Sequence, residues 1–470
     1  MENRKTNSKE IFGRATETIA AISTPPGRGG IGIVRLSGPE AASIAAQLVR
    51  LRQPLEHGHV RWADVLDELD ASDSNSHAGR IDEALVTYFA APHSYTTEDL
   101  VEIAAHGSPV VLELLLSRAL ALGARLAEPG EFTQRAFLSG KLDLTQAEAV
   151  RDLIEAQTLT QARQAASQIG GALSRRVGPV KQSLVELIAL LEAGIDFAED
   201  DVDVTPQAEI SRRIGGLTPP LTAFEASFAR GRIVHDGLTL AIVGRPNAGK
   251  SSLFNRLVER ERAIVTATPG TTRDTVTERI SLDGIPLELV DTAGLRESVE
   301  EVEQLGIHRS REALADAALV VVVLDATEPL NAEERRLIAA VEGRPALVAS
   351  NKSDLIETKS PLPDCGGLPV LATSALTGEG IPALRERILA LATGGAAAEP
   401  GMLTSLRHQQ AVAGTLAALA DAARANENSI PHEMILLDLY RALGALDSLT
   451  GQTTNDDILH LIFSTFCIGK

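Results

Sequence analysis

The sequence predicts a multidomain protein with an α+β N-terminal domain, an α-helical bundle domain and an α/β domain inserted into the bundle. A length of 470 residues accommodates about three domains of ordinary size. Residues 238–392 alternate strand-like and helix-like runs with glycine-rich turns, which is typical of a parallel sheet. Two helical stretches of similar composition flank that block, and neither of them alone would bury its apolar faces.

The N-terminal region, residues 1–140, mixes short β-type runs such as "GIGIVRLSG" and "LVEIAAHG" with amphipathic runs such as "VVLELLLSRALAL". This mixture predicts an α+β domain. Residues 141–236 form the first half of the predicted helical domain, because "LTQAEAVRDLIEAQTLTQARQAASQ" repeats apolar residues at spacings of three and four. The acidic stretch "IDFAEDDVDVTPQAE" interrupts these helices as a loop.

Residues 237–393 make up the predicted α/β domain, and "ATGGAAAEPG" at 392–401 is typical of a linker. Residues 394–470 return to helical periodicity through "SLRHQQAVAGTLAALADAARA" and "ILLDLYRALGAL", and they end in the tail "FCIGK". We therefore predict that residues 141–236 and 394–470 pack together as one bundle.

The composition limits the classes of function. A net charge of −19 argues against non-specific coating of nucleic acid, although it does not exclude RNA as a partner. The local excess of lysine and arginine before Arg61 indicates either a basic surface or ordinary solvated charge. Two cysteines, Cys365 and Cys467, give no disulfide framework, and no apolar run reaches the roughly 18 residues of a membrane span. The N-terminus resembles no secretory signal, so we expect a cytoplasmic protein without a membrane partner.

A phosphate-binding loop is predicted at "GRPNAGKSS", where Gly244, Gly249, Lys250 and Ser251 match the pattern G-x-x-x-x-G-K-S. The motif follows the strand-like "LTLAIV" and precedes the helix-like "SLFNRLV", which is the context that such a loop requires. Backbone amides at the helix N-terminus would face the phosphates. Lys250 would reach the β and γ oxygens, and the Ser251 hydroxyl would ligate Mg²⁺.

Three further motifs follow in the order expected of a GTPase. "DTAG" at 291–294 would hold Mg²⁺ through water and sense the γ-phosphate, and Thr272 would close over the metal. "NKSD" at 351–354 would recognise guanine through Asp354, and such polar pairing rejects the wrong base by about 10⁴–10⁵, so the nucleotide is GTP rather than ATP. "TSAL" at 373–376 would support the base with main-chain amides. The predicted nucleotide-binding residues are Asn247, Ala248, Gly249, Lys250, Ser251, Ser252, Thr266, Ala267, Thr268, Pro269, Gly270, Thr271, Thr272, Asp291, Thr292, Ala293, Gly294, Asn351, Lys352, Asp354, Ser374, Ala375 and Leu376.

The hydrolytic chemistry departs from that of Ras-like proteins. Leu295 stands where those proteins carry the glutamine that orients the attacking water. No arginine finger, a group that raises the hydrolysis rate roughly 10³–10⁵-fold, can be identified from the sequence. Another group must therefore neutralise charge in the transition state. Asn247 is either a ligand for a monovalent cation or an asparagine that caps the loop.

Beyond the GTPase motifs, "TPPGRGGIGIVRLSG", "PGEFTQRAFLSGKLDLTQAEAV" and the terminal "FCIGK" resemble the MnmE (TrmE) family of tRNA-modification GTPases over nearly the full length. The resemblance implies a homodimer whose N-terminal domains bind a reduced folate, either 5-formyltetrahydrofolate or methylenetetrahydrofolate. It also implies an FAD-containing MnmG-like partner in a heterotetramer. Together they would add a (carboxymethyl)aminomethyl group to carbon 5 of the wobble uridine of certain tRNAs.

The resemblance also implies roles for residues in the GTPase domain. Family members are stimulated by K⁺, and the ion would be held by Asn247, Thr266, Thr268 and Thr271 in place of an arginine finger. Glu303 would orient the hydrolytic water. Without the resemblance, Glu303 would be interpreted as a solvated helix residue.

For the folate, the family pattern falls on Arg35, Glu102, Lys141 and the terminal Lys470. From their charges, the cations would bind the glutamate tail of folate, and the carboxylate would accept hydrogen bonds from the N–H groups of the pterin. Without the family, Arg35 and Glu102 would be an edge-strand ion pair and Lys141 a surface charge. "HGSP" at 106–109 replaces the "HGG" turn of many relatives, which affects the expected pose of the folate.

The terminal "FCIGK" is interpreted as part of the folate site. Docked there, Lys470 becomes a ligand, and Gly469 gives the backbone freedom to place it. Cys467 is then a nucleophile, a general acid or base, or a packing residue. The alternative function is a GTPase switch for RNA or ribosome assembly without one-carbon chemistry, and the folate residues and the tail are the features that distinguish the two.

Overall fold

The structure is a computed structural model, and it describes residues 17–66, 79–196, 205–258, 277–291, 317–356, 362–395, 401–452, 459 and 462–469. The chain divides into two compact units. The first contains residues Met1–Arg151 and Thr450–Lys470, and the second contains Asp152–Leu449. The two units are described separately below. Among the described residues, no helix is both long and apolar enough to cross a membrane.

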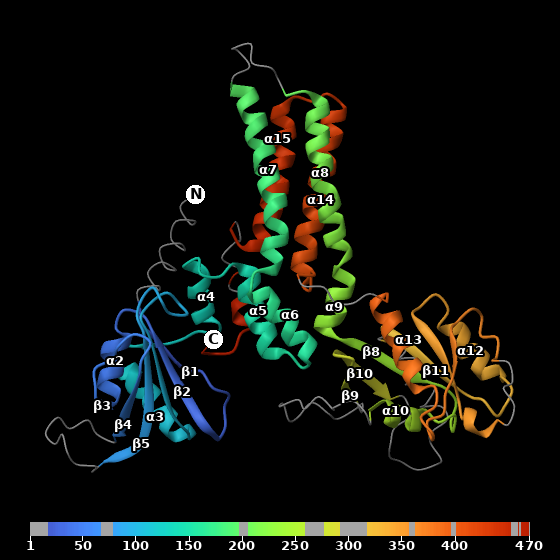
Figure 1. The fold of residues 1–470 in the computed structure, drawn as a ribbon, viewed down its shortest axis with the longest axis horizontal. Coiled ribbons are helices and arrows are strands. Elements are labelled where there is room, and N and C mark those ends of the chain that lie inside the picture. Colours follow the sequence, from blue (N-terminus) through green and yellow to red (C-terminus); the bar gives the residue numbers. More distant parts are fainter. Residues whose placement is uncertain are drawn as a thin grey trace. The chain divides into compact units, whose positions relative to one another are not determined.

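The first unit is built on a seven-stranded sheet with the order β3-β4-β5-β6-β2-β1-β7. Strands β1 to β5 of this sheet are labelled in Figure 1. Neighbouring strands are antiparallel except β1 and β7. Helices α2 and α3 cover one face, where alternate apolar residues of the strands form the core. The bounds are β1 Ile19–Ile22, β2 Gly29–Ser37, α2 Ala41–Leu48, β3 Arg50–Leu51, β4 Val60–Leu66, β5 Arg80–Phe89, β6 Leu100–Gly107, α3 Pro109–Ala121 and β7 Arg125–Leu126.

The end of the chain packs in this first unit, beside helices α4 (Glu131–Leu138) and α5 (Leu144–Glu155). Phe463 and Phe466 are buried in a small cluster with Leu144 and Ala147 of α5. An isolated bridge joins Ile468 to Pro129. The end of the chain is therefore part of the same domain as the N-terminal sheet.

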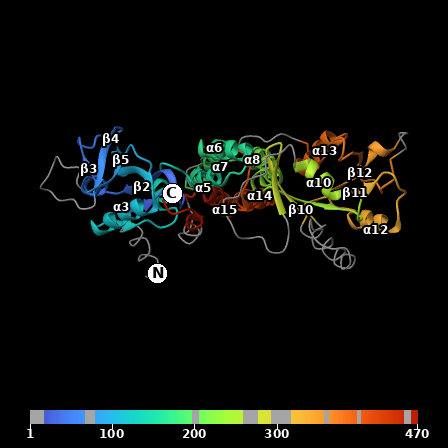
Figure 2. The same ribbon diagram turned by 90° about the horizontal axis from the view of Figure 1, so that it is seen from below.

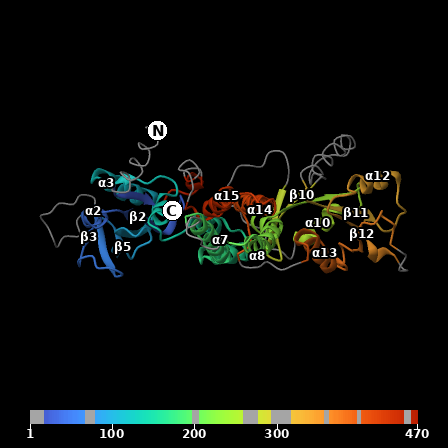
Figure 3. The ribbon, with the colours of Figure 1, turned by 90° about the horizontal axis from the view of Figure 1, so that it is seen from above.

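A bundle of four long helices forms one part of the second unit: α7 (Ala172–Asp196), α8 (Gln207–Ala226), α14 (Leu406–Glu427) and α15 (His432–Thr450). Views from below and above show these helices gathered side by side (Figures 2 and 3). They come from both sides of the α/β block, and together they bury one core. The prediction of an α/β domain inserted into a helical bundle is confirmed. Of two shorter helices, α9 (Phe228–Asp236) connects α8 to β8, and α6 (Leu159–Ile169) precedes α7.

The other part of the second unit is a six-stranded sheet with the order β13-β12-β11-β8-β10-β9. Its strands are parallel except β9, which forms an antiparallel hairpin with β10. Helices α10 and α13 pack on one face and α12 on the other, so the central strands β8, β11 and β12 are buried on both faces and are mostly apolar. The bounds are β8 Leu238–Val243, α10 Lys250–Val258, β9 Thr277–Leu282, β10 Ile285–Asp291, β11 Leu319–Asp325, α12 Ala332–Ala340, β12 Ala346–Asn351, β13 Val370–Ala372 and α13 Ile381–Thr393.

Candidate functional site

The phosphate-binding loop lies between β8 and α10, as the sequence predicts, and glycine is required at two of its positions. Gly244 has φ +155°, and a Cβ there would lie 2.3 Å from the Val323 carbonyl oxygen. Gly249 has φ +91°, and a Cβ there would lie 2.2 Å from the Asn351 side-chain nitrogen. Any larger residue would push the loop away from the strands that support it.

Lys250 lies at the start of α10 and is turned back over the loop. Its Nζ donates to the carbonyl oxygens of Gly244 at 2.8 Å and Arg245 at 2.9 Å. The ammonium is thereby held at the loop where a phosphate would bind. Asn247 is exposed with φ +64°, a left-handed conformation that asparagine tolerates better than most residues.

Asn351, the first residue of "NKSD", joins three of the four nucleotide motifs. It is buried at the end of β12 and only 1% exposed. Its Nδ2 donates to the Ala248 carbonyl oxygen at 3.0 Å, and its Oδ1 accepts from the Ala375 backbone amide at 3.0 Å. One amide side chain therefore fixes the phosphate-binding loop against the loop that is predicted to support the base.

Of the other residues predicted to lie near the base, some shape the loops and others are exposed to a ligand. Ser374 is buried, and its Oγ accepts from the Thr377 amide at 3.0 Å, so it shapes the loop. Asp354, in a short 3₁₀ turn, and Leu376 are exposed, which leaves them open to a ligand. Lys352 has φ +64°, and its Nζ donates to Asp325 Oδ2 at 2.6 Å.

Asp325, at the end of β11, belongs to an ion-pair cluster that sequence analysis did not predict. Burial alone would raise the pKa of this carboxyl, but hydrogen bonds from Lys352 and Thr327 outweigh it and lower the pKa to about 2. Arg245 Nη2 lies 3.5 Å from Asp325 Oδ2 and its Nε lies 3.1 Å from Glu334 Oε1. In the sequence, the feature that could have indicated this cluster is an acidic residue at the end of a strand.

Several predicted residues lie outside the described part of the chain. Asp291 ends β10, and its α-carbon pairs with that of Ile242 in β8, but its side chain is not among those described. The residues outside the described ranges are Thr266, Ala267, Thr268, Pro269, Gly270, Thr271, Thr272, Thr292, Ala293, Gly294, Glu303 and Lys470.

A second site lies in the first unit, where Arg35 and Glu102 face each other across β2 and β6. Arg35 donates to Glu102 Oε1 through Nε at 3.0 Å and Nη2 at 2.7 Å. Both strands are internal to the sheet, so the ion pair is not the edge-strand pair that a reading without the family would give. The third nitrogen of the Arg35 guanidinium, Nη1, donates to the Gly469 carbonyl oxygen at 3.2 Å.

The predicted folate residues share an aromatic cluster. The Arg35 guanidinium lies 5.6 Å from the ring centroid of Phe132, and Lys141 Nζ lies 6.0 Å from that of Tyr95. Tyr95 packs against the apolar cluster that contains Phe132. Lys141 also donates to the Ser94 carbonyl oxygen. Arg35, Glu102, Lys141 and Gly469 therefore lie in one part of the first unit.

The "HGSP" turn directs the chain from β6 into α3. Gly107 ends the strand, Ser108 is the N-cap residue without a side-chain cap, and Pro109 occupies the first turn of the helix. The His106 backbone N–H donates to Asp82 Oδ2 at 2.9 Å, and His106 Nδ1 lies 2.6 Å from Asp82 Oδ1.

The two cysteines differ in environment, because Cys365 is buried and Cys467 is exposed.

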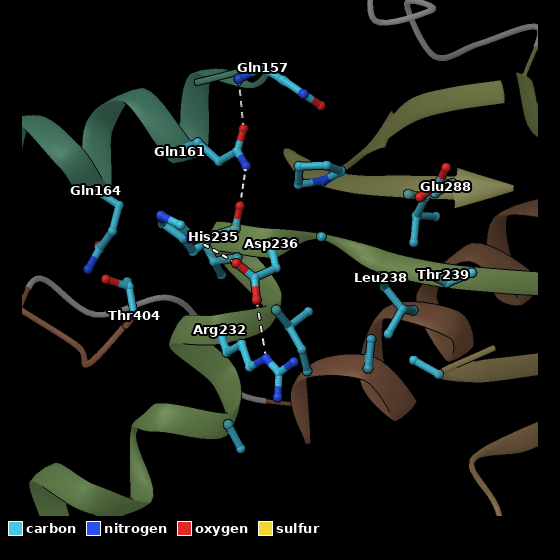
Figure 4. Close-up of a pocket in the computed structure, with 18 of the residues that line it drawn as sticks. Gln157, Gln161, Gln164, Arg232, His235, Asp236, Leu238, Thr239, Glu288 and Thr404 are labelled. Carbon is cyan, nitrogen blue, oxygen red and sulfur yellow. Dashed lines mark hydrogen bonds and ion pairs between the residues drawn. The ribbon is translucent and has the colours of Figure 1, made fainter. Parts of the chain in front are cut away.

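A cavity of about 780 Å³ lies in the second unit between α6, α9 and the β9–β10 hairpin (Figure 4). His235 Nε2 lies 3.3 Å from Asp152 Oδ1, and His235 Nδ1 lies 2.7 Å from Asp236 Oδ1. The hydrogen bond to Asp152 outweighs burial and raises the pKa of His235 to about 9. Gln161 Nε2 donates to the His235 carbonyl oxygen at 2.6 Å, a contact drawn in Figure 4. Sequence analysis did not single out any of these residues.

Comparisons with known proteins cover nearly all of the chain. The MnmE helical domain family matches residues 144–467, and the family described as the GTP-binding protein TrmE N-terminus matches residues 18–141. The tRNA modification GTPase MnmE of Koribacter versatilis is 57% identical over 459 residues, which is 97% of this chain and 99% of the relative. The protein of the same name from Moorella thermoacetica is 41% identical over 471 residues, again 97% and 99% of the two chains. Among solved structures, the G domain of the T. maritima FeoB iron transporter is similar to 33% of this chain and 98% of its own, with 29% identity and a TM-score of 0.25.

Proposed function

Because this chain belongs to the MnmE family of tRNA modification GTPases, we propose that it binds and hydrolyses GTP in its α/β domain and uses that cycle to modify tRNA. The observation that carries the GTPase part is the Asn351 bridge between Ala248 and Ala375. The bridge fixes the phosphate side and the base side of one nucleotide pocket relative to each other. Exposed Asp354 then accepts hydrogen bonds from guanine, and adenine lacks the matching donors.

Mg²⁺ is the metal that this pocket would hold with GTP. Ser251 lies in the first turn of α10, and Asp291 ends the strand that pairs with β8, so both belong to the loop edge of the sheet. Hydroxyl and carboxylate oxygens are the donors that Mg²⁺ prefers. Ser251 would ligate the ion directly, with Thr272 as the switch ligand and Asp291 acting through water. The ion would neutralise charge on the phosphate oxygens.

The step from GTP to GDP is proposed to need K⁺. Leu295 replaces the glutamine of Ras-like proteins, so the chain itself must supply another means of catalysis. In our proposal Asn247 and Thr266, Thr268 and Thr271 hold K⁺, and Glu303 orients the attacking water. The exposed position of Asn247 at the loop supports this assignment, since a ligand there is accessible to an ion.

The first unit is proposed to bind the reduced folate that donates one carbon. The grouping of Arg35, Glu102 and Lys141 with the end of the chain supports this, because a cation and a carboxylate complement folate chemically. The donor would be 5-formyltetrahydrofolate or methylenetetrahydrofolate. With an FAD-containing MnmG-like partner in a heterotetramer, the protein would add a (carboxymethyl)aminomethyl group to carbon 5 of wobble uridine in the cytoplasm.

A homodimer is proposed because two large apolar side chains are exposed on one face of the N-terminal sheet. Trp62 is 46% exposed and Leu85 43% exposed, and the two residues face each other across β4 and β5. They lie on the face opposite the one covered by α2 and α3. Neighbouring exposed apolar side chains of this kind are a feature of protein–protein interfaces.

Two measurements test the proposed function. GTP hydrolysis by the full chain should be strongly slower when Na⁺ replaces K⁺, and equal rates in the two salts would refute the cation role of Asn247. Mass spectrometry of tRNA nucleosides from cells lacking the protein should show unmodified wobble uridines. Unchanged wobble nucleosides, together with intact GTP hydrolysis, would instead support an assembly GTPase without one-carbon chemistry.

A further inference from the structure

The end of the chain is held at two points, one on each side of Cys467. On the first side Phe463 and Phe466 are buried against α5, with ring centroids 5.5 Å apart. Arg151 fixes the same turn, because its Nη1 donates to Thr465 Oγ1 at 2.7 Å and its guanidinium lies 5.9 Å from the Phe466 ring centroid. These contacts anchor the chain before the tail begins.

On the second side, two donors converge on one carbonyl group. The Gly469 carbonyl oxygen accepts from Ser23 Oγ at 3.1 Å and from Arg35 Nη1 at 3.2 Å. A carbonyl oxygen has two lone pairs, so both bonds can form at once. Gly469 is buried with φ +92°, and a Cβ there would lie 2.8 Å from the Ile22 carbonyl oxygen. The two donors fix the plane of the peptide that leads into the last residue.

Between the two anchors, the backbone is held while the side chains are exposed. The Gly130 amide donates to the Cys467 carbonyl oxygen at 3.4 Å, and Ile468 forms a bridge with Pro129. Ile468 is nevertheless 51% exposed, and the Cys467 thiol is exposed as well. Chain ends without such ties usually fray. A fixed backbone that presents exposed side chains is the arrangement that a ligand-contacting segment needs.

We infer that Ser23 is a positioning residue which, with Arg35, clamps the Gly469 carbonyl and sets the tail in place for the reduced folate. The same Arg35 donates two hydrogen bonds to Glu102, and both are accepted by Oε1. One guanidinium therefore ties the tail to the carboxylate that is proposed to face the pterin. Ser23 acts through the tail and not on the folate itself. This inference rests on the proposed folate function.

The experiment compares Ser23→Ala with Ser23→Thr, which keeps the hydroxyl, in the full chain. Ser117→Ala is the matched control, because Ser117 is an exposed serine whose hydroxyl, among the described residues, donates to the Leu114 carbonyl oxygen of its own helix. Hydrogen exchange of the tail peptide is measured without ligand, and 5-formyltetrahydrofolate is then titrated. Loss of one hydrogen bond is worth about 0.5–1.5 kcal/mol, so Ser23→Ala should weaken folate binding roughly twofold to tenfold and speed tail exchange.

The outcomes separate the clamp from the folate function. Faster tail exchange and weaker folate binding in Ser23→Ala, with both restored in Ser23→Thr and unchanged in Ser117→Ala, would support the inference. Tail exchange and folate affinity in Ser23→Ala equal to those of the wild type would overturn it. If folate fails to bind even the wild-type chain, the proposed folate function is wrong, whereas the exchange rates still decide whether Ser23 holds the tail.

Discussion

The nucleotide pocket and the C-terminal tail site are built in opposite ways. The pocket is formed by short motifs that follow parallel strands of one sheet, and Asn351 joins the two loops that would hold GTP. The tail site closes over a sequence separation of 446 residues between Ser23 and Gly469. A site of the first kind needs only its own domain. A site of the second kind depends on the end of the chain reaching its place, so the two should fail independently.

The strongest test of this difference is Gly249→Ala. The substitution combines a left-handed backbone with a Cβ that would lie 2.2 Å from Asn351, so the phosphate-binding loop must shift. Backbone strain of this kind costs about 1–3 kcal/mol before the displaced contact is counted, and we expect GTP affinity to fall at least about 100-fold in a binding titration. Folate binding in the first unit should be unaffected.

The control for that variant is Gly343→Ala, where φ is +78° and nothing lies within 4 Å of the new Cβ. It introduces the backbone strain without the clash. If Gly343→Ala weakens GTP binding as much as Gly249→Ala does, contact with Asn351 is not what shapes the loop.

Gly469→Ala should produce the converse result. A Cβ there would lie 2.8 Å from the Ile22 carbonyl oxygen and would break the clamp on the tail. We expect 5-formyltetrahydrofolate to bind about tenfold more weakly, while GTP hydrolysis keeps its wild-type rate. Gly123→Ala, with φ +105° and no neighbour within 4 Å, is the matched control. A loss of GTP hydrolysis in Gly469→Ala alone would show that the two sites are not separable.

A smaller effect is expected at the cavity where α9 leads into β8. The pKa of His235, raised to about 9 by Asp152, exceeds the ordinary value of 6.5. The folded state therefore binds this proton more tightly than the unfolded chain, and the stabilisation is complete below pH 6.5 and is lost as the pH rises through 9. Between pH 7 and 10 the melting temperature should fall by about 2–4 °C more in the wild type than in Asp152→Asn. Equal pH profiles for the two proteins would contradict the role of this ion pair.

Local sequence could predict the parts of the molecule that local geometry determines. Gly244 and Gly249 were recognisable because a loop that passes close to strand ends tolerates no Cβ, and the inserted α/β domain was visible in the alternating periodicity. Arg35 and Glu102 were singled out through the family resemblance, and their ion pair was expected only without it; the place of the pair between two internal strands depends on sheet order.

The rest depended on contacts between distant segments. Ser23 is an ordinary serine in the sequence, and only the docked tail gives it a partner. Asp325 and Arg245 form an ion pair because β11 lies beside β8 in the sheet, an order that chain sequence does not display. His235 and Asp152 meet because α9 and α5 end at the same cavity. No spacing rule connects such residues.

The role of the chain end is tested most directly by combining Cys467→Ser with deletion of Lys470 and measuring two quantities for this variant. One is the rate of GTP hydrolysis in K⁺, and the other is the fraction of modified wobble uridine in tRNA, determined by mass spectrometry. We predict that hydrolysis persists while modification collapses. Wild-type levels of modified uridine in that variant would contradict the claim that the end of the chain serves the one-carbon chemistry.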